Sequence, residues 1–214
     1  MHINQIPVTD GHMPTQVTLA APGQPGVLIV PPERGLGPGC EPLTQRFARA
    51  GMTAMTPDLL WRTTSASPRQ ILDDLTHARH WLAARGVGPV IALGIGFGGR
   101  FAILSASRGT VDAAITWHSP GLTQLTRLAG RLRGTISMHF GETDPGCPPD
   151  DIDLLRRAFG KTSVCVHPTV GQDFTQKGLL GYNPIASNAV FADILRSLRT
   201  LTDAAAECYH TMRA

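Results

Sequence analysis

The sequence predicts an α/β protein with a mostly parallel central sheet and helices on both faces. Short apolar runs bounded by turn residues alternate with segments of helical period along most of the 214 residues, which is the pattern of repeated βα units. Several runs are apolar at consecutive positions, as strands are when both faces of a sheet are covered. We find no linker or internal repeat, so we expect a single domain over residues 1–214.

Six apolar runs are predicted to be strands, because turn residues stand on either side of each. They cover residues 26–30, 53–55, 90–93, 113–117, 135–140 and 163–166.

The clearest predicted helix has Ser67 as its N-cap, Pro68 at the first helical position and Gln70 at the third, which is a capping box. It should stop at Gly86. Further helices are expected near residues 100–107, 150–159 and 184–201, and the segment beginning Gly39-Cys40 should lead into another.

The charge pattern argues against nucleic acid as a partner. The net charge of +3 comes from 19 basic and 16 acidic residues, and no run of Lys or Arg follows a phosphate backbone. The first residues lack a basic and an apolar region, and no stretch approaches the ~18 apolar residues of a membrane span. We therefore expect a soluble, cytoplasmic protein that does not bind membranes.

Neither a metal nor an organic cofactor is expected. The four cysteines are widely spaced without a CxxC pair, which indicates free thiols. The one close histidine pair, His77 and His80, lacks an evident third ligand. Cys40 stands near the start of a predicted helix, where its thiol pKa can fall, but no base accompanies it.

Five sequence segments resemble motifs of the dienelactone hydrolase family of α/β-hydrolases. In order they are TPDLLWR (56–62), GIGFGG (94–99), HFGETD (139–144), GQDF (171–174) and YNP (182–184). The resemblance covers residues 26 to 201. It implies the α/β-hydrolase fold, with a catalytic triad in the order nucleophile, acid, histidine.

Two of the three triad positions implied by this resemblance carry other residues. The nucleophile position is Gly96, the acid is Asp144 and the base position is Gln172. Glycine has no atom that attacks a carbonyl, and an amide does not accept a proton near neutral pH, so the covalent route is closed. The backbone N–H groups that hold the oxyanion in the family map to Phe97 and Arg34, and they survive a side-chain replacement.

Three residues are candidates for acid–base chemistry. Glu33 aligns with a glutamate that faces the nucleophile, and in a dry pocket its pKa would rise; a salt bridge with Arg34 or Arg62 is the alternative. Asp144 either contacts ligand or remains a buried, hydrogen-bonded relic. His118 follows a strand at the predicted ligand edge of the sheet, where it serves either proton transfer or structure.

The remaining candidates concern ligand binding. Loss of the thiol and imidazole leaves room at Gly96 and Gln172 for a bulkier ligand. Trp61, Arg62 and Tyr182 are expected at the mouth of the pocket, with Arg62 suited to a carboxylate or enolate; surface or packing roles are the alternative.

These observations favour a non-hydrolytic enzyme, of isomerase or cyclase type, acting on a small lactone-like or polyketide-like metabolite. One alternative is an inactive protein that binds a metabolite or a partner enzyme. Another is a weak hydrolase in which a carboxylate activates water. Whether the protein forms a homodimer stays open.

Overall fold

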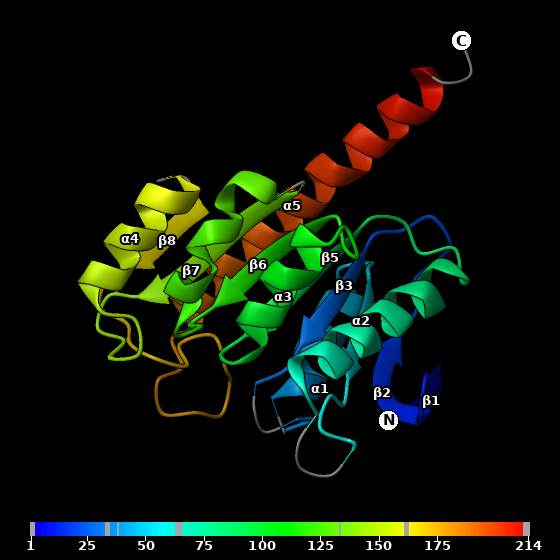
Figure 1. Ribbon diagram of the computed structural model, residues 1–214, viewed down its shortest axis with the longest axis horizontal. Coiled ribbons are helices and arrows are strands. Elements are labelled where there is room, and N and C mark those ends of the chain that lie inside the picture. Colours follow the sequence, from blue (N-terminus) through cyan, green and yellow to red (C-terminus); the bar gives the residue numbers. More distant parts are fainter. Residues whose placement is uncertain are drawn as a thin grey trace.

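The computed structural model describes residues 3–32, 35–37, 39–62, 66–132, 134–160 and 163–211, with side chains up to residue 203. Over this part of the chain the strands form an eight-stranded sheet in the order β1-β2-β4-β3-β5-β6-β7-β8 (Figure 1). Neighbours from β4 to β8 pair in parallel, whereas β2 pairs antiparallel with both β1 and β4. The predicted mostly parallel sheet is confirmed.

All six predicted strands are present, and four of them extend one or two residues further at the carboxyl end. The strands are β1 (Ile3–Val8), β2 (Gly11–Thr18), β3 (Gly26–Val30), β4 (Thr53–Pro57), β5 (Val90–Ile95), β6 (Ala113–Trp117), β7 (Thr135–Gly141) and β8 (Val164–His167). Every residue of β3, β4, β5 and β6 is buried. This burial explains their uninterrupted apolar runs.

The hairpin of β1 and β2 was not predicted from the sequence. Each strand contains a proline, Pro7 and Pro14, and because proline cannot donate to a strand ladder, neither segment reads as a strand from its sequence alone. Pro7 lies in the edge strand β1, and Pro14 lies just before the stretch of β2 that pairs with β4, residues 15–18. The hairpin strands pair from Val8 opposite Gly11 to Ile3 opposite Gln16.

The helices are α1 (Cys40–Arg49), α2 (Pro68–Ala83), α3 (Gly98–Ser107), α4 (Pro149–Phe159) and α5 (Pro184–Thr211), with a 3-10 helix η1 (Leu122–Arg131) that was not predicted. The capping box at the start of α2 is confirmed, because the side chains of Ser67 and Gln70 each accept from the other's backbone N–H. The residues after 201, for which the sequence allowed either a longer helix or a frayed end, extend the last helix to Thr211.

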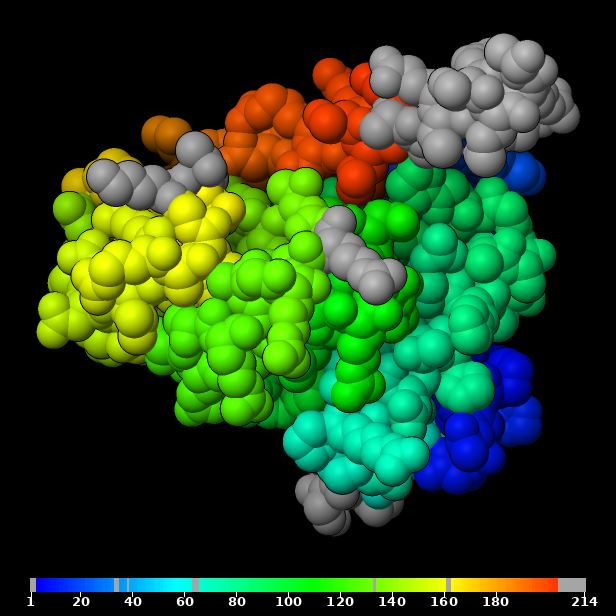
Figure 2. Space-filling view, turned by 45° about the horizontal axis from the view of Figure 1, so that its top comes forward, coloured from blue at the N-terminus to red at the C-terminus, as the bar shows by residue number. Residues whose placement is uncertain are grey.

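Helices cover both faces of the sheet, as predicted. On one face α2, α3 and α4 contribute Leu75, Phe101 and Leu155 to a common core, and Figure 2 looks onto this side, with α2 in teal and α4 in yellow. On the other face α1 and α5 contribute Phe47 and Ile194 to a second core. In the described part of the chain, no helix has the length and apolar character needed to cross a membrane.

Candidate active site

The turn from β5 into α3 keeps the geometry of a nucleophile elbow at Gly96. Gly96 has a φ of 52°, in the left-handed region that favours glycine. Its N–H donates to the carbonyl oxygen of Trp117 at 3.0 Å, which ties the turn to the end of β6. Phe97 follows at the N-cap of α3, where the first N–H groups of a helix lack partners within the helix. These groups are suited to hold an anionic oxygen.

Other glycines of the elbow are required by close packing. A Cβ on Gly94 would lie 2.4 Å from the Cα of Gly99, and a Cβ on Gly98 would lie 2.1 Å from the carbonyl oxygen of Val30. Real Cβ atoms do not approach other heavy atoms so closely. The glycines therefore let α3 rest directly on β3 and β5, which fixes the turn in place.

A cavity of about 410 Å³ opens beside this turn, and we call it the elbow cavity. It brings together four of the residues predicted from the sequence, Gly96, Phe97, His118 and Gln172. Its wall also includes Asp173 and Gln176, and the segment that continues to Gly181.

His118 lies at the end of β6 and is 1% exposed. Its Nε2 is 2.9 Å from the hydroxyl of Thr175, and its Nδ1 is 3.7 Å from Oδ1 of Asp173. Burial lowers the pKa of His118 to about 4, so the imidazole is neutral at neutral pH. A neutral imidazole beside a carboxylate can help to move a proton.

Asp173 was not predicted as a site residue. It has a φ of 63°, a conformation that Asp tolerates better than most residues. Its Oδ1 accepts a hydrogen bond from the Gln176 amide at 3.0 Å. Among the described residues lining the elbow cavity, Asp173 supplies the carboxylate. Its place within the GQDF motif was the available signal, but the direction of a side chain in a loop is not encoded by spacing.

Asp144 is buried outside the residues that line the elbow cavity. Its Oδ1 accepts from the N–H of Gly146 at 2.8 Å, whereas its Oδ2 has no hydrogen-bond partner in the described structure. Burial raises the pKa of this carboxyl. The neighbouring segments are linked, since the N–H of Thr143 donates to the carbonyl of Val170. Asp144, the acid of the implied triad, is therefore held in place by its Oδ1, and no basic side chain contacts its Oδ2 in the described structure.

Trp61 and Arg62 do not line the elbow cavity. The Arg62 guanidinium forms ion pairs with Asp10, in the hairpin turn, and with Asp74, on α2. The indole N–H of Trp61 donates to Asp74 at 3.3 Å, and the Arg62 guanidinium stacks 4.4 Å from the Trp61 ring. These contacts correspond to the packing alternative, in which both residues join the hairpin to α2.

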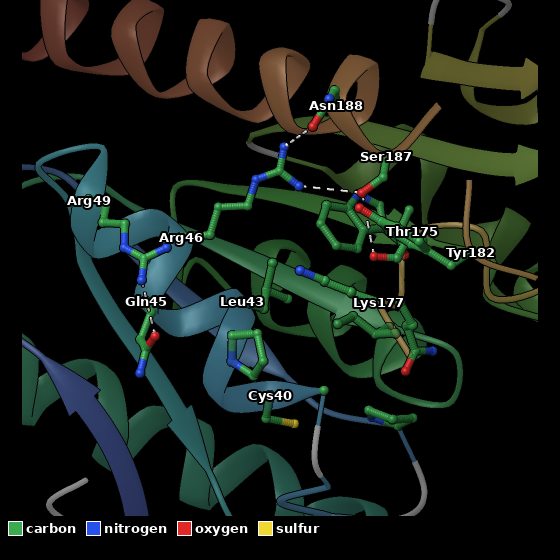
Figure 3. Close-up of a pocket in the computed structure, with 16 residues that line it drawn as sticks. Cys40, Leu43, Gln45, Arg46, Arg49, Thr175, Lys177, Tyr182, Ser187 and Asn188 are labelled. Atoms are coloured by element: carbon green, nitrogen blue, oxygen red, sulfur yellow. Dashed lines mark hydrogen bonds between the residues drawn. The ribbon is translucent and has the colours of Figure 1, made fainter. Parts of the chain in front are cut away.

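Tyr182 lines a second cavity, of about 510 Å³, together with Cys40 and Arg46 (Figure 3). We call it the basic pocket. It shares Pro32 and Gln176 with the elbow cavity, so the two are neighbours. Burial raises the pKa of the Cys40 thiol, which keeps it protonated.

Glu33 and Arg34 fall outside the described residues. Within the described ranges, no group of three or more His, Cys, Asp or Glu side chains is placed to hold a metal ion.

Two curated relatives resemble the chain over most of its length. A putative carboxymethylenebutenolidase of Azospirillum brasilense is 24% identical over 205 residues, which cover 83% of this chain and 89% of the relative. A protein of the same description from Yersinia pestis is 23% identical over 182 residues, covering 70% and 68% of the two chains.

Solved structures share the fold. A putative dienelactone hydrolase from Klebsiella pneumoniae superposes with a TM-score of 0.81 at 20% identity, covering 92% of this chain and 97% of that one. A dienelactone hydrolase-like promiscuous phosphotriesterase from metagenomic libraries gives a TM-score of 0.74 at 20% identity, covering 94% and 98%. The family model of the dienelactone hydrolases matches residues 15–202. With its α/β-hydrolase fold and its elbow at Gly96, the chain therefore belongs to the dienelactone hydrolase family.

Proposed function

We propose that this protein binds a small lactone or related carbonyl compound in the elbow cavity and promotes proton transfer, as an isomerase or cyclase does, without a covalent intermediate. The observation that carries the proposal is the proximity of the Asp173 carboxylate to Nδ1 of His118, at 3.7 Å. This pair faces a cavity at whose elbow glycine stands in the nucleophile position. The site thus combines acid–base groups with an oxyanion frame and offers no attacking atom at residue 96.

In the proposed reaction the ligand's carbonyl oxygen lies at the N–H of Phe97. The Asp173 carboxylate removes a proton from the carbon next to the carbonyl, and the electron pair of that C–H bond forms an enolate. The N–H stabilises the enolate oxygen, an effect of about 3 kcal/mol. The protonated Asp173 then returns the proton to another carbon of the same enolate, which completes an isomerisation without a change in charge.

His118 supports this step by positioning Asp173. When the Thr175 hydroxyl donates to Nε2, the imidazole carries its proton on Nδ1, the nitrogen that faces Asp173. Gln176 donates to the same carboxylate oxygen. The carboxylate is then held facing the ligand.

Hydrolysis is the second candidate, because both curated relatives carry the description putative carboxymethylenebutenolidase. In this reaction Asp173 would take a proton from water, and the resulting hydroxide would add to the lactone carbonyl at the same oxyanion frame. The ring oxygen would leave with that proton and yield an open hydroxy acid. Both candidate reactions use the Asp173 carboxylate, so both predict that replacing Asp173 slows the reaction. They differ in the product that forms.

The test uses the purified protein with unsaturated five-membered lactones in D₂O, followed by NMR. Deuterium at the carbon next to the carbonyl, or a moved double bond, supports proton transfer, whereas ring opening supports hydrolysis. Asp173→Asn should lower the rate about 100-fold or more. Asp153→Asn, at a carboxylate that is 60% exposed on α4, is the matched control and should not alter the rate.

An unchanged rate in Asp173→Asn would refute the assigned role of this carboxylate. A ligand adduct on any side chain, detected by mass spectrometry during turnover, would refute the non-covalent route. Ligand-induced thermal stabilisation with no product would favour a binding protein.

A further inference from the structure

The basic pocket lies between α1 and the start of α5, beside the elbow cavity (Figure 3). Ile95 and Trp117, at the ends of β5 and β6, line its sheet side. At about 510 Å³ it has the size of a small-molecule site.

Positive charge dominates the described lining of this pocket. Arg46, Arg49 and Lys177 lie in the wall, and the described lining residues include no aspartate or glutamate. None of these three cations forms an ion pair with an acidic side chain among the described residues. The pocket therefore carries charge that the described part of the protein does not neutralise.

Arg46 is held in a fixed position by neutral groups. Its guanidinium donates to the Ser187 hydroxyl at 3.3 Å and to Oδ1 of Asn188 at 2.7 Å. It also stacks 3.8 Å from the centre of the Phe191 ring. Burial lowers the pKa of this guanidinium, which is the sign of a cation that has lost water without gaining an anion. An anion in the pocket would restore that lost stabilisation.

The remaining wall suits an organic body. Pro42 and Leu43 supply apolar surface, and Tyr182 adds an aromatic ring with a hydroxyl group. A guanidinium has five N–H donors, and two hydrogen bonds from Arg46 to the protein leave others for a ligand.

We propose that the basic pocket binds the carboxylate or phosphate group of a small organic anion, with Arg46 as its main partner and Arg49 and Lys177 as supporting charges. Guanidinium groups bind both kinds of oxyanion through paired hydrogen bonds.

The pocket adjoins the elbow cavity. Gln176 lines both cavities, and its amide donates to Asp173. Anion binding does not rest on the proposed reaction, because the charges of the pocket are present whether or not turnover occurs.

Binding is measured by isothermal titration calorimetry with phenylacetate, phenyl phosphate and the neutral phenylacetamide. At least one anion should bind, and the amide should bind at least tenfold more weakly. The relative affinity of the two anions identifies the preferred oxyanion. Added salt should weaken the binding of the anion, since the attraction is electrostatic.

Variants distinguish anion binding in the pocket from a general effect of positive charge on the surface. Arg46→Gln should raise the Kd of the anion tenfold or more. Arg49→Gln and Lys177→Gln, at exposed side chains, should each raise it two- to fivefold, and they keep the test valid if Arg46→Gln folds poorly. Arg85→Gln is the matched control: Arg85 also stacks on an aromatic ring, that of Trp81, at 3.4 Å, but it lies outside the pocket and should leave the Kd unchanged.

The inference is overturned if neither anion binds at millimolar concentration or if the amide binds as tightly. An unchanged Kd in the pocket variants, or an equal loss in Arg85→Gln, would also overturn it. Asp173→Asn distinguishes this inference from the proposed function, because it should slow turnover strongly and retain anion binding.

Discussion

Replacing Arg62 with methionine should destabilise the protein by about 3–5 kcal/mol and leave ligand affinity in the elbow cavity unchanged. Asp74 is 1% exposed, and both of its carboxylate oxygens accept from the Arg62 guanidinium. Its other hydrogen-bond partner in the described structure is the indole N–H of Trp61, at 3.3 Å. The substitution would leave a carboxylate buried without its cation, which is the costly way to break such a pair.

The other partner of Arg62 supplies the matched control. Asp10 is 47% exposed, and exposed ion pairs contribute about 1 kcal/mol or less. Asp10→Asn should therefore have a small effect on the free energy of unfolding. The double variant Arg62→Met with Asp74→Leu should recover most of the lost stability, because apolar residues replace both buried charges.

The measurement is urea unfolding, with the midpoint and slope compared between variants, together with ligand titration of each folded variant. If Arg62→Met stays within about 1 kcal/mol of the parent and weakens ligand binding tenfold, the packing interpretation is wrong. Arg62 would then bind ligand, as the sequence first suggested.

Three further predictions concern the elbow, the core and the triad positions. Gly98→Ala should lower stability by about 2 kcal/mol or more, since its Cβ would meet the Val30 carbonyl at 2.1 Å, whereas Gly130→Ala, in open space, should be neutral in thermal melts. Burial holds the pKa of His139 at about 3 instead of 6.5, so the unfolded chain takes up its proton first and stability falls as the pH drops from 6.5 towards 3. His139→Gln should flatten this decline, by about 1.4 kcal/mol per pH unit, in urea titrations at several pH values; an unchanged slope would contradict the assignment. Gly96→Cys combined with Gln172→His should produce a burst with p-nitrophenyl acetate that neither single variant gives, if the old triad geometry persists around Asp144.

Much of the fold could be predicted because its signals are local. The central strands are apolar at every position when both faces are buried, and Ser67 and Gln70 form their capping box within four residues. The hairpin could not be predicted in this way, because Pro7 and Pro14 argue against strands unless it is known which residues of each strand pair on each side. The 3-10 helix after Gly121 does have a periodic pattern, because Leu122, Leu125 and Leu128 recur at every third residue, so this helix could have been predicted from the sequence.

The site was predicted where the family motif fixes the backbone, as at Gly96, Phe97 and Gln172. It was not predicted where partners are distant in the sequence. Arg62 contacts Asp10, which is 52 residues away in the sequence, and Arg46 contacts Asn188, which is 142 residues away. The spacing of residues in the sequence therefore revealed neither the ion pairs nor the basic pocket. The direction of the Asp173 side chain depends on the left-handed backbone conformation of Asp173 itself, and sequence patterns do not specify such a conformation in a loop.

The tight contacts of Gly94 and Gly98 make the elbow side of the cavity rigid. On the elbow side backbone rests on backbone, and that wall cannot yield when a ligand enters. Another part of the cavity wall is the loop through Leu179 and Leu180, two residues that are 39% and 109% exposed. Adaptation to ligands of different shape must therefore occur in this loop, and engineered selectivity should be sought there first.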